Sequence, residues 1–165
     1  MPIPYVVLFS SDAAGGLALS KTEAVLSEFP DLRLLSVTVE SRTNIAGARR
    51  GLAALLPGGL PRRFIGIYAA SHVDDLGGFL CLVAPNPLIF VPIPENPAAG
   101  LRLLKEAASR GAPTVALGEA GARNAALLAI SMWAFGAGSD KLRKSLDAFR
   151  SSQTAAVRKM ELPAA

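Results

Sequence analysis

Short apolar segments that alternate with longer segments of helical character constrain this chain more than any other feature of its sequence. The apolar segments are continuous and too short for helices, which is typical of buried strands. They are IPYVVLF, LRLLSVTV, FIGIYAA, LIFVPI and PTVAL. Segments that we expect to be helical lie at residues 17–29, 45–56, 74–84, 98–109, 122–135 and 140–160. Strands that are apolar on both faces, each followed by a helix, predict a parallel sheet with helices on both sides.

The expected fold is a single α/β domain over residues 1–165. Right-handed crossovers favour a Rossmann-like or flavodoxin-like parallel sheet, here of about five strands. In such folds, ligands bind beyond the carboxyl ends of the strands. The segments at those ends are SSDAAGG, ESRTN, ASHVDDLGG, PENPAAG and GEAGARN. Functional residues are therefore sought in these five segments.

Composition narrows the environment that we expect for the chain. Hydrophobic residues make up 51% of it, yet its longest apolar stretch, at 125–135, is well short of the roughly 20 residues that a membrane span needs. Excess apolar surface commonly ends in a subunit interface, so we expect self-assembly. The single cysteine, Cys81, excludes an internal disulfide, and MPIPYVVLFS lacks the features of a signal peptide. Both observations favour the cytoplasm.

The charge balance permits an anionic ligand. The formal net charge is +4 and the pI is near 9.6. The basic residues are scattered, and no aromatic residues alternate with them. We therefore expect no nucleic-acid partner and no membrane partner.

Two glycine-containing segments at strand ends could receive an anion. GEAGARN, with Gly118 and Gly121, predicts a strand-to-helix turn whose free backbone amides can hold a phosphate or carboxylate. SSDAAGG, with Ser10, Ser11 and Asp12, is a second candidate. Close packing of a helix on a strand explains the glycines equally well. Neither segment has the lysine of a P-loop or the spacing of a dinucleotide fingerprint, so we predict no cofactor.

His72 is the only histidine and precedes Asp74 and Asp75. A base, a metal ligand or an orienting pair is conceivable there. Neighbouring residues rarely converge on one ion, so we predict no metal site, and a solvated loop or a helix cap is the favoured role of the two aspartates. Arg42, just past the second strand, could hold a phosphate through two parallel hydrogen bonds or could lie on the surface.

TVALGEAGARNAALLA followed by LDAFRSSQTAAV closely resembles the C-terminal third of the PurE family. This family contains carboxyaminoimidazole ribonucleotide mutases and aminoimidazole ribonucleotide carboxylases of purine biosynthesis. Its G-x-A-G-A-x-N-A-A-L-L-A pattern is followed by W/F-R-x-x-Q-T, and PLIFVPI looks like its P-V-I-G-V-P-V strand. The resemblance implies a three-layer αβα domain. It also implies a homo-octamer in which the C-terminal helix, about residues 140–160, packs on neighbouring subunits.

The phosphate-binding loops of the family are partly kept. Its first loop, G-S-x-S-D-W, is FSSDAAGG here: Ser10 stands for the first serine, and the aspartate is either lost at Ala13 or shifted to Asp12. In the second loop, S-A-H-R-T-P, Arg42 and Thr43 keep the arginine and threonine. The strand-end loops and the resemblance together predict ligand binding by Ser10, Ser11, Asp12, Arg42, Thr43, Ser71, Leu76, Gly78, Gly118 and Gly121.

The catalytic histidines of the family are replaced. Ser41 stands where the second loop has the histidine that moves the proton, and serine cannot supply that acid/base chemistry near neutrality. The third loop, G-G-A-A-H-L-P-G, places Asp75 at the histidine, while Leu76 and Gly78 keep the leucine and last glycine. His72 falls three places early. The candidate catalytic positions are therefore Ser41, Asp75 and His72.

Three functions remain open. The first is a divergent PurE-like protein that binds a phosphorylated ribonucleotide or related anion, with weak or absent mutase activity. It would be either non-catalytic or repurposed for another carboxylation, decarboxylation or isomerisation, with Asp75, Glu40 and His72 as acid/base candidates. The second is a structural or regulatory subunit that co-assembles with an active paralogue. The third is an ordinary mutase or carboxylase that uses His72 or Asp75.

Overall fold

The computed structural model describes residues 3–38, 58–72, 86–109, 118–136 and 139–159, together with residues 46 and 50. The predicted helix at 74–84, the predicted strand PTVAL at 113–117 and nearly all of the predicted helix at 45–56 lie outside the described residues. The same holds for Cys81 and for six predicted site residues, which are Ser41, Arg42, Thr43, Asp75, Leu76 and Gly78.

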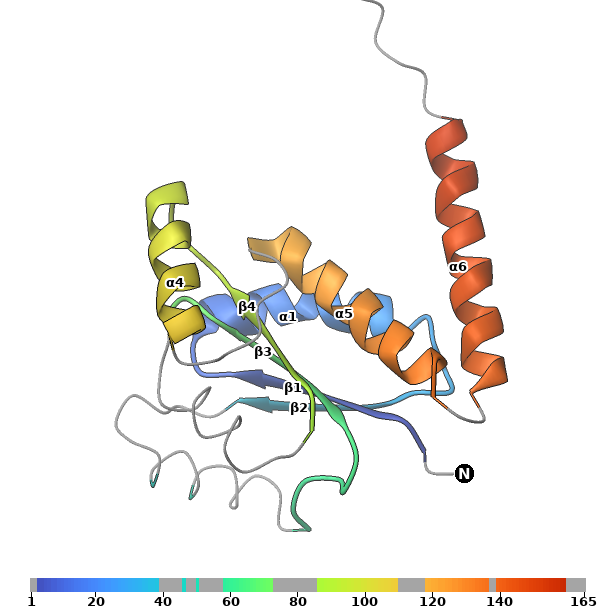
Figure 1. Ribbon diagram of the computed structural model, residues 1–165, viewed down its shortest axis with the longest axis horizontal. Coiled ribbons are helices and arrows are strands. Elements are labelled where there is room, and N and C mark those ends of the chain that lie inside the picture. The colour runs from blue at the N-terminus through green and yellow to red at the C-terminus, as the bar shows by residue number, and fades with distance from the viewer. Residues whose placement is uncertain are drawn as a thin grey trace, which may run out of the picture.

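A parallel sheet forms the centre of the described structure (Figure 1). Its strands are β1 (Tyr5–Ser10), β2 (Arg33–Thr38), β3 (Ile65–Ala70) and β4 (Leu88–Pro92). They are arranged in the order β2-β1-β3-β4, and every pair of neighbours is parallel. The predicted α/β class is confirmed, with four strands in the described part of the chain rather than about five.

Helices cover both faces of the sheet. Residues that alternate along β1 enter two different cores, because successive side chains of a strand point to opposite faces. Val6 and Leu8 pack on one face with α1 (Ala13–Leu26) and α5 (Gly118–Ala134). Val7 and Phe9 pack on the other face, to which α4 (Pro97–Ser109) contributes Ala107. This is the expected three-layer arrangement.

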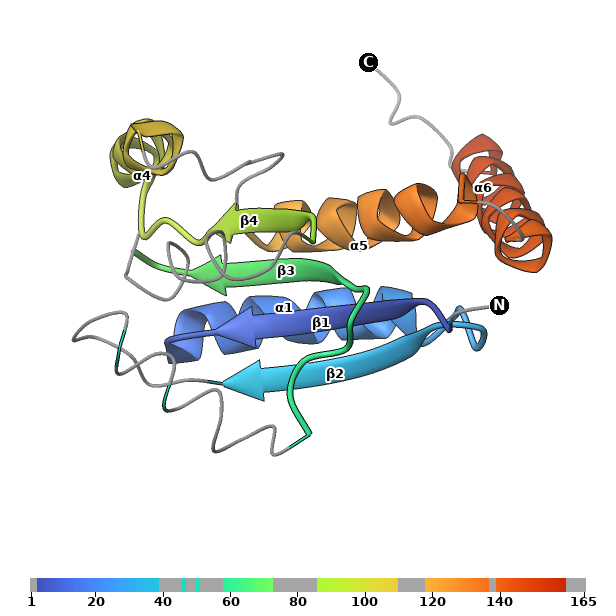
Figure 2. The same cartoon turned by 60° about the horizontal axis from the view of Figure 1, so that its bottom comes forward.

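Helices α1 and α5 lie side by side and run back from the carboxyl-end edge of the sheet (Figure 2). The hydroxyl of Thr22 in α1 donates to the carbonyl of Ala122 in α5 at 3.0 Å, in the interior. At the other end of α5, the indole N–H of Trp133 donates to the carbonyl of Tyr5 at 3.0 Å. Side-chain hydrogen bonds therefore join the start of α5 to α1 and the end of α5 to β1.

Two helices begin earlier than the sequence predicted. Helix α1 begins at Ala13 rather than at residue 17, because Asp12 is its N-cap and accepts from the Gly15 amide. Gly15 brings α1 close to β3: a Cβ at this position would lie 2.0 Å from the carbonyl oxygen of Ala69. Helix α5 begins at Gly118, so GEAGARN forms its first turns rather than an open turn.

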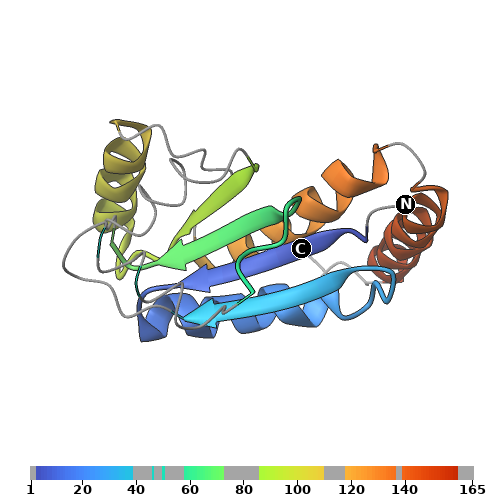
Figure 3. The ribbon, with the colours of Figure 1, turned by 90° about the horizontal axis from the view of Figure 1, so that it is seen from below.

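The last helix, α6 (Asp140–Arg158), lies at the end of the sheet opposite α4 (Figure 3). Its first half packs on the body through buried Leu142 and Leu146. The ring of Phe149 lies on that of Phe29, with 5.6 Å between the ring centroids. Residues 150–159 are all exposed, including Val157 at 63%. Only the first half of α6 is thus packed against the described chain.

Candidate functional site

The loops that follow β1 and β3 meet at the carboxyl-end edge of the sheet. β1 and β3 are neighbours, with Ser10 opposite Ala69, so Ser11 and Asp12 face Ser71 and His72. From β1, the chain adds β2 on one side of the sheet and then β3 and β4 on the other, so its winding reverses between β1 and β3. Such a switch point is where loops of doubly wound folds diverge and ligands bind. Five predicted site residues therefore lie together: Ser10, Ser11, Asp12, Ser71 and His72.

The carboxylate of Asp12 is the centre of this cluster. Its Oδ1 accepts from the Gly15 amide at 2.6 Å. Its Oδ2 accepts from both the amide of Ser71, at 2.8 Å, and the Ser71 hydroxyl, at 2.9 Å. Nδ1 of His72 lies 3.2 Å from the same oxygen. One side chain thus caps α1 and joins the β1 loop to the β3 loop.

The hydrogen bonds to Asp12 hold it in the ionised form. Burial by itself would raise the pKa of this carboxyl. The amides of Gly15 and Ser71, the hydroxyl of Ser71 and the neighbouring His72 outweigh burial and lower its pKa below the ordinary value of 3.8. A carboxylate beside an imidazole is therefore present at neutral pH.

His72 is the group of the cluster best placed to meet a ligand. Its side chain is 42% exposed, whereas that of Asp12 is only 13% exposed. The Ser71 hydroxyl lies 3.3 Å from Nδ1. When Nδ1 of a neutral ring donates to a carboxylate, Nε2 is the nitrogen that accepts a proton. An imidazole held in this way can pass a proton to or from a ligand, with Asp12 orienting the ring.

Ser10 and Ser11 lie in the same loop but are buried, at 2% and 6% exposure. The Ser10 hydroxyl pairs with that of Thr38 at 3.1 Å, which joins the ends of β1 and β2. The Ser11 hydroxyl pairs with that of Tyr68 at 2.9 Å. Both serines thus stiffen the edge of the sheet, and their predicted contact with a ligand stays a prediction.

Gly118 and Gly121 lie in the first turn of α5, and Gly121 is buried. Gly118 has φ +67°, and a Cβ added there would meet nothing within 4 Å, so its backbone conformation, not close packing, favours glycine at this position. The first amides of a helix have no intrahelical acceptor and can hold an anion, and the predicted ligand contact of this segment stays a prediction.

Sequence reasoning missed the partnership of Asp12 with His72. It grouped His72 with Asp74 and Asp75, which lie outside the described residues. The available signal was the strand order of doubly wound folds, in which the first and third strands are neighbours. That order brings residue 12 beside residue 72.

Two surface hollows lined by described residues lie away from this cluster. One, of about 500 Å³, is lined by Ile3, Tyr5, Pro61, Arg62 and Arg63 near the start of β1. The other, of about 530 Å³, lies along α6. We define the candidate site by the hydrogen bonds and the ion pair of Asp12. Segments 39–45 and 73–85, which follow β2 and His72 in the sequence, are not described.

The described residues lack two features that would have suggested other functions. They contain no group of three or more His, Cys, Asp or Glu side chains arranged to hold a metal ion. None of the helices among them combines the length and the apolar character needed to cross a membrane. Comparison of the sequence with models of known protein families and with curated proteins gives no match.

Ionised Asp12 is expected to make stability depend on pH. The pKa of Asp12 is lower in the folded chain than in the unfolded chain. Its contribution to the free energy of unfolding is therefore full above the unfolded pKa of about 4 and is lost as the pH falls through the folded pKa. In Asp12→Asn, the side-chain oxygen can still accept from the Gly15 amide. The side-chain NH2 group, however, then faces the amide and hydroxyl of Ser71, which are also donors. We expect a loss of about 1.5–3 kcal/mol of unfolding free energy at neutral pH, which shrinks below about pH 4.

Urea unfolding followed by circular dichroism, at neutral pH and near pH 3, measures this difference. Asp31→Asn, which removes an exposed carboxylate, is the matched control and should change stability little at either pH. An equal loss for Asp12→Asn at both pH values would show that the ionised form is not what stabilises the loop junction.

Proposed function

We propose that this chain is a PurE-like protein that binds a small phosphorylated ribonucleotide-like anion at the carboxyl ends of β1 and β3. His72 moves a proton of that ligand and Asp12 orients its ring. The observation that carries this proposal is the 3.2 Å contact between Nδ1 of His72 and Oδ2 of Asp12, at the switch point of the sheet. The reaction class is a carboxylation, decarboxylation or isomerisation of an aminoimidazole ribonucleotide-like substrate.

The proposed division of labour follows from the chemistry of the cluster. Proton transfer at a carbon that gains or loses a carboxylate needs a group that both accepts and donates near neutrality, which imidazole does. The Asp12 carboxylate orients the ring. The first backbone amides of α5 and the arginine at position 42 suit the phosphate. His72 would thus replace the histidine that the family has at the position of Ser41.

Calorimetric titration with aminoimidazole ribonucleotide and with its carboxylated forms, combined with an interconversion assay on the same samples, tests the proposal. We expect a dissociation constant between about 1 μM and 1 mM and measurable turnover. Binding without turnover would show that the chain binds the ligand but does not catalyse the reaction, so the role of His72 in proton transfer would be wrong. If none of these compounds binds, the proposed ligand class is wrong.

A second candidate, a subunit of a larger assembly, has its own observation in favour. Large apolar side chains are exposed on α1, α4 and α6 and just after α5. They are Leu17 at 64%, Leu101 at 58%, Val157 at 63% and Phe135 at 78%. Exposed apolar surface of this kind is typical of subunit interfaces. The partner would be another copy of the chain, as in a homo-octamer, or an active paralogue. Analytical ultracentrifugation of the purified chain, alone and mixed with that paralogue, distinguishes self-assembly from assembly with the paralogue.

A further inference from the structure

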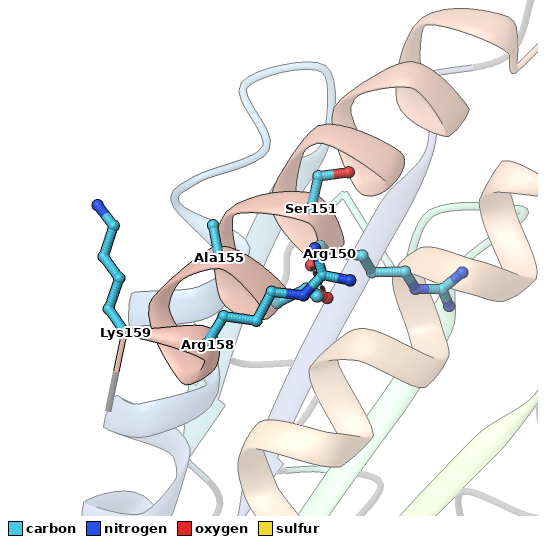
Figure 4. A pocket seen from close by; sticks show the side chains of 6 residues that line it. Arg150, Ser151, Ala155, Arg158 and Lys159 are labelled. Atoms are coloured by element: carbon cyan, nitrogen blue, oxygen red, sulfur yellow. Dashed lines mark hydrogen bonds between the residues drawn. The ribbon is translucent and has the colours of Figure 1, made fainter. Parts of the chain in front are cut away.

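The exposed half of α6 carries a basic surface that the proposed reaction does not use. The hollow of about 530 Å³ there is lined by Arg150, Ser151, Thr154, Ala155, Arg158 and Lys159. Figure 4 shows that the side chains of Arg150 and Arg158 extend to the same side of the helix, while Lys159 extends away. α6 lies far from the carboxyl-end edge of the sheet (Figure 2), so this surface is separate from the Asp12–His72 cluster.

The spacing of the side chains creates the hollow. Arg150, Thr154 and Arg158 follow one another at intervals of four residues, which places them on one face of a helix. The small side chains of Ser151, Thr154 and Ala155 lie between the cations and leave space there. The two arginines are about 12 Å apart along the helix axis, from the rise of 1.5 Å per residue. The face thus offers separated cationic donors around an open middle.

The cations of this face are not neutralised by the described chain. The Nη2 atom of Arg150 donates to the Ser131 hydroxyl at 3.1 Å, which directs its guanidinium along the surface. The ion pair found among the described residues is that of His72 with Asp12. No carboxylate in that part of the molecule therefore pairs with Arg158 or Lys159.

We propose that this face binds a polyphosphate group, that is, a small molecule with two or three linked phosphates. Guanidinium groups hold phosphate oxygens through paired hydrogen bonds, and two of them separated along a helix suit a linear polyanion better than a single phosphate. A second copy of the same face would be repelled by its like charge. Single-stranded nucleic acid is disfavoured because no aromatic side chain lines the hollow to stack on a base.

Calorimetric titration of the whole chain with sodium tripolyphosphate tests this site. We expect saturable binding that is at least about tenfold tighter than that of orthophosphate. In the double variant Arg150→Gln/Arg158→Gln, the dissociation constant should rise at least about tenfold. The control Arg62→Gln/Arg63→Gln removes two exposed guanidinium groups from the other hollow. It should change the dissociation constant of tripolyphosphate less than about twofold. The single variant Arg158→Gln, at the exposed end of α6, should weaken binding in the same direction, and circular dichroism confirms its fold.

Several results would overturn the proposal. Equal weakening in both double variants would mean that net charge, not this face, attracts the anion, and absence of saturable binding would exclude the site. Displacement of tripolyphosphate by a short oligonucleotide at lower concentration would assign the face to nucleic acid. Dissociation of an oligomer by Arg150→Gln/Arg158→Gln would assign it to self-assembly. Turnover of the aminoimidazole ribonucleotide-like substrate should be unchanged in Arg150→Gln/Arg158→Gln, which keeps this test independent of the proposed reaction.

Discussion

Gly15→Ala is expected to destabilise the fold by about 3 kcal/mol or more, at the upper end of the cost of overpacking. The added Cβ would lie 2.0 Å from the carbonyl oxygen and 2.7 Å from the carbonyl carbon of Ala69. These are backbone atoms of β3, which is hydrogen-bonded to β1 on one side and β4 on the other. The strand cannot retreat, so α1 would have to move and would loosen the cap at Asp12.

The neighbouring glycine provides the matched control. At Gly16 an added Cβ would meet only the Ser10 hydroxyl, at 3.8 Å, and the position is exposed within the same helix. Gly16→Ala should therefore gain about 0.5–1 kcal/mol from helix propensity. Urea unfolding followed by circular dichroism measures both variants. Similar changes at the two positions would show that α1 does not lie as close to β3 as the structure has it.

His72→Asn is expected to lower turnover of an aminoimidazole ribonucleotide-like substrate by about 10²–10⁴-fold. Asparagine can still hydrogen-bond to Asp12 but cannot exchange a proton near neutrality. Because His72 acts on the ligand after it has bound, the dissociation constant of the ligand should change little. Steady-state rates and calorimetry on the same preparation separate these two effects.

Chemical rescue makes this prediction specific. In His72→Ala, added imidazole should restore part of the lost rate, since it can occupy the vacated place beside Asp12 and carry the proton. Lys144→Gln, on an exposed position of α6, should keep the full rate and respond to imidazole no more than the unmodified chain does. Full activity of His72→Asn would remove His72 from the reaction and leave the acid/base role to a residue of segments 39–45 or 73–85.

The sheet could be predicted from the sequence because β3 and β4 are apolar without interruption. All six residues of β3 and all five of β4 are buried, so no alternation suggests an open face. β2, with the sequence RLLSVT, lies at an edge of the sheet next to β1 and is mostly exposed. Its edge position depends on which strand it pairs with, and the residues of β2 alone do not encode that.

The start of α1 was harder to predict because it depends on a contact with a residue far away in the sequence. Two consecutive glycines are weak helix formers, so the sequence favoured a loop up to Leu17. The contact of Gly15 with Ala69, distant in the chain, makes glycine necessary inside the helix. The predicted α/β class placed the candidate site at the strand ends. The resemblance to the PurE family compares loops in sequence order, so it did not indicate the pair of Asp12 and His72, which depends on strand order.

Trp133 is the only tryptophan of the chain, and its indole N–H bonds to the carbonyl of Tyr5 at the first residue of β1. It therefore lies at the opposite end of β1 from Asp12 and His72. Its intrinsic emission should report the separation of α5 from the sheet and remain insensitive to ligand at the carboxyl-end edge. The imidazole proton resonances of the single histidine should respond in the converse way. The molecule thus carries two spectroscopic reporters, one for the integrity of the fold and one for events at its candidate site.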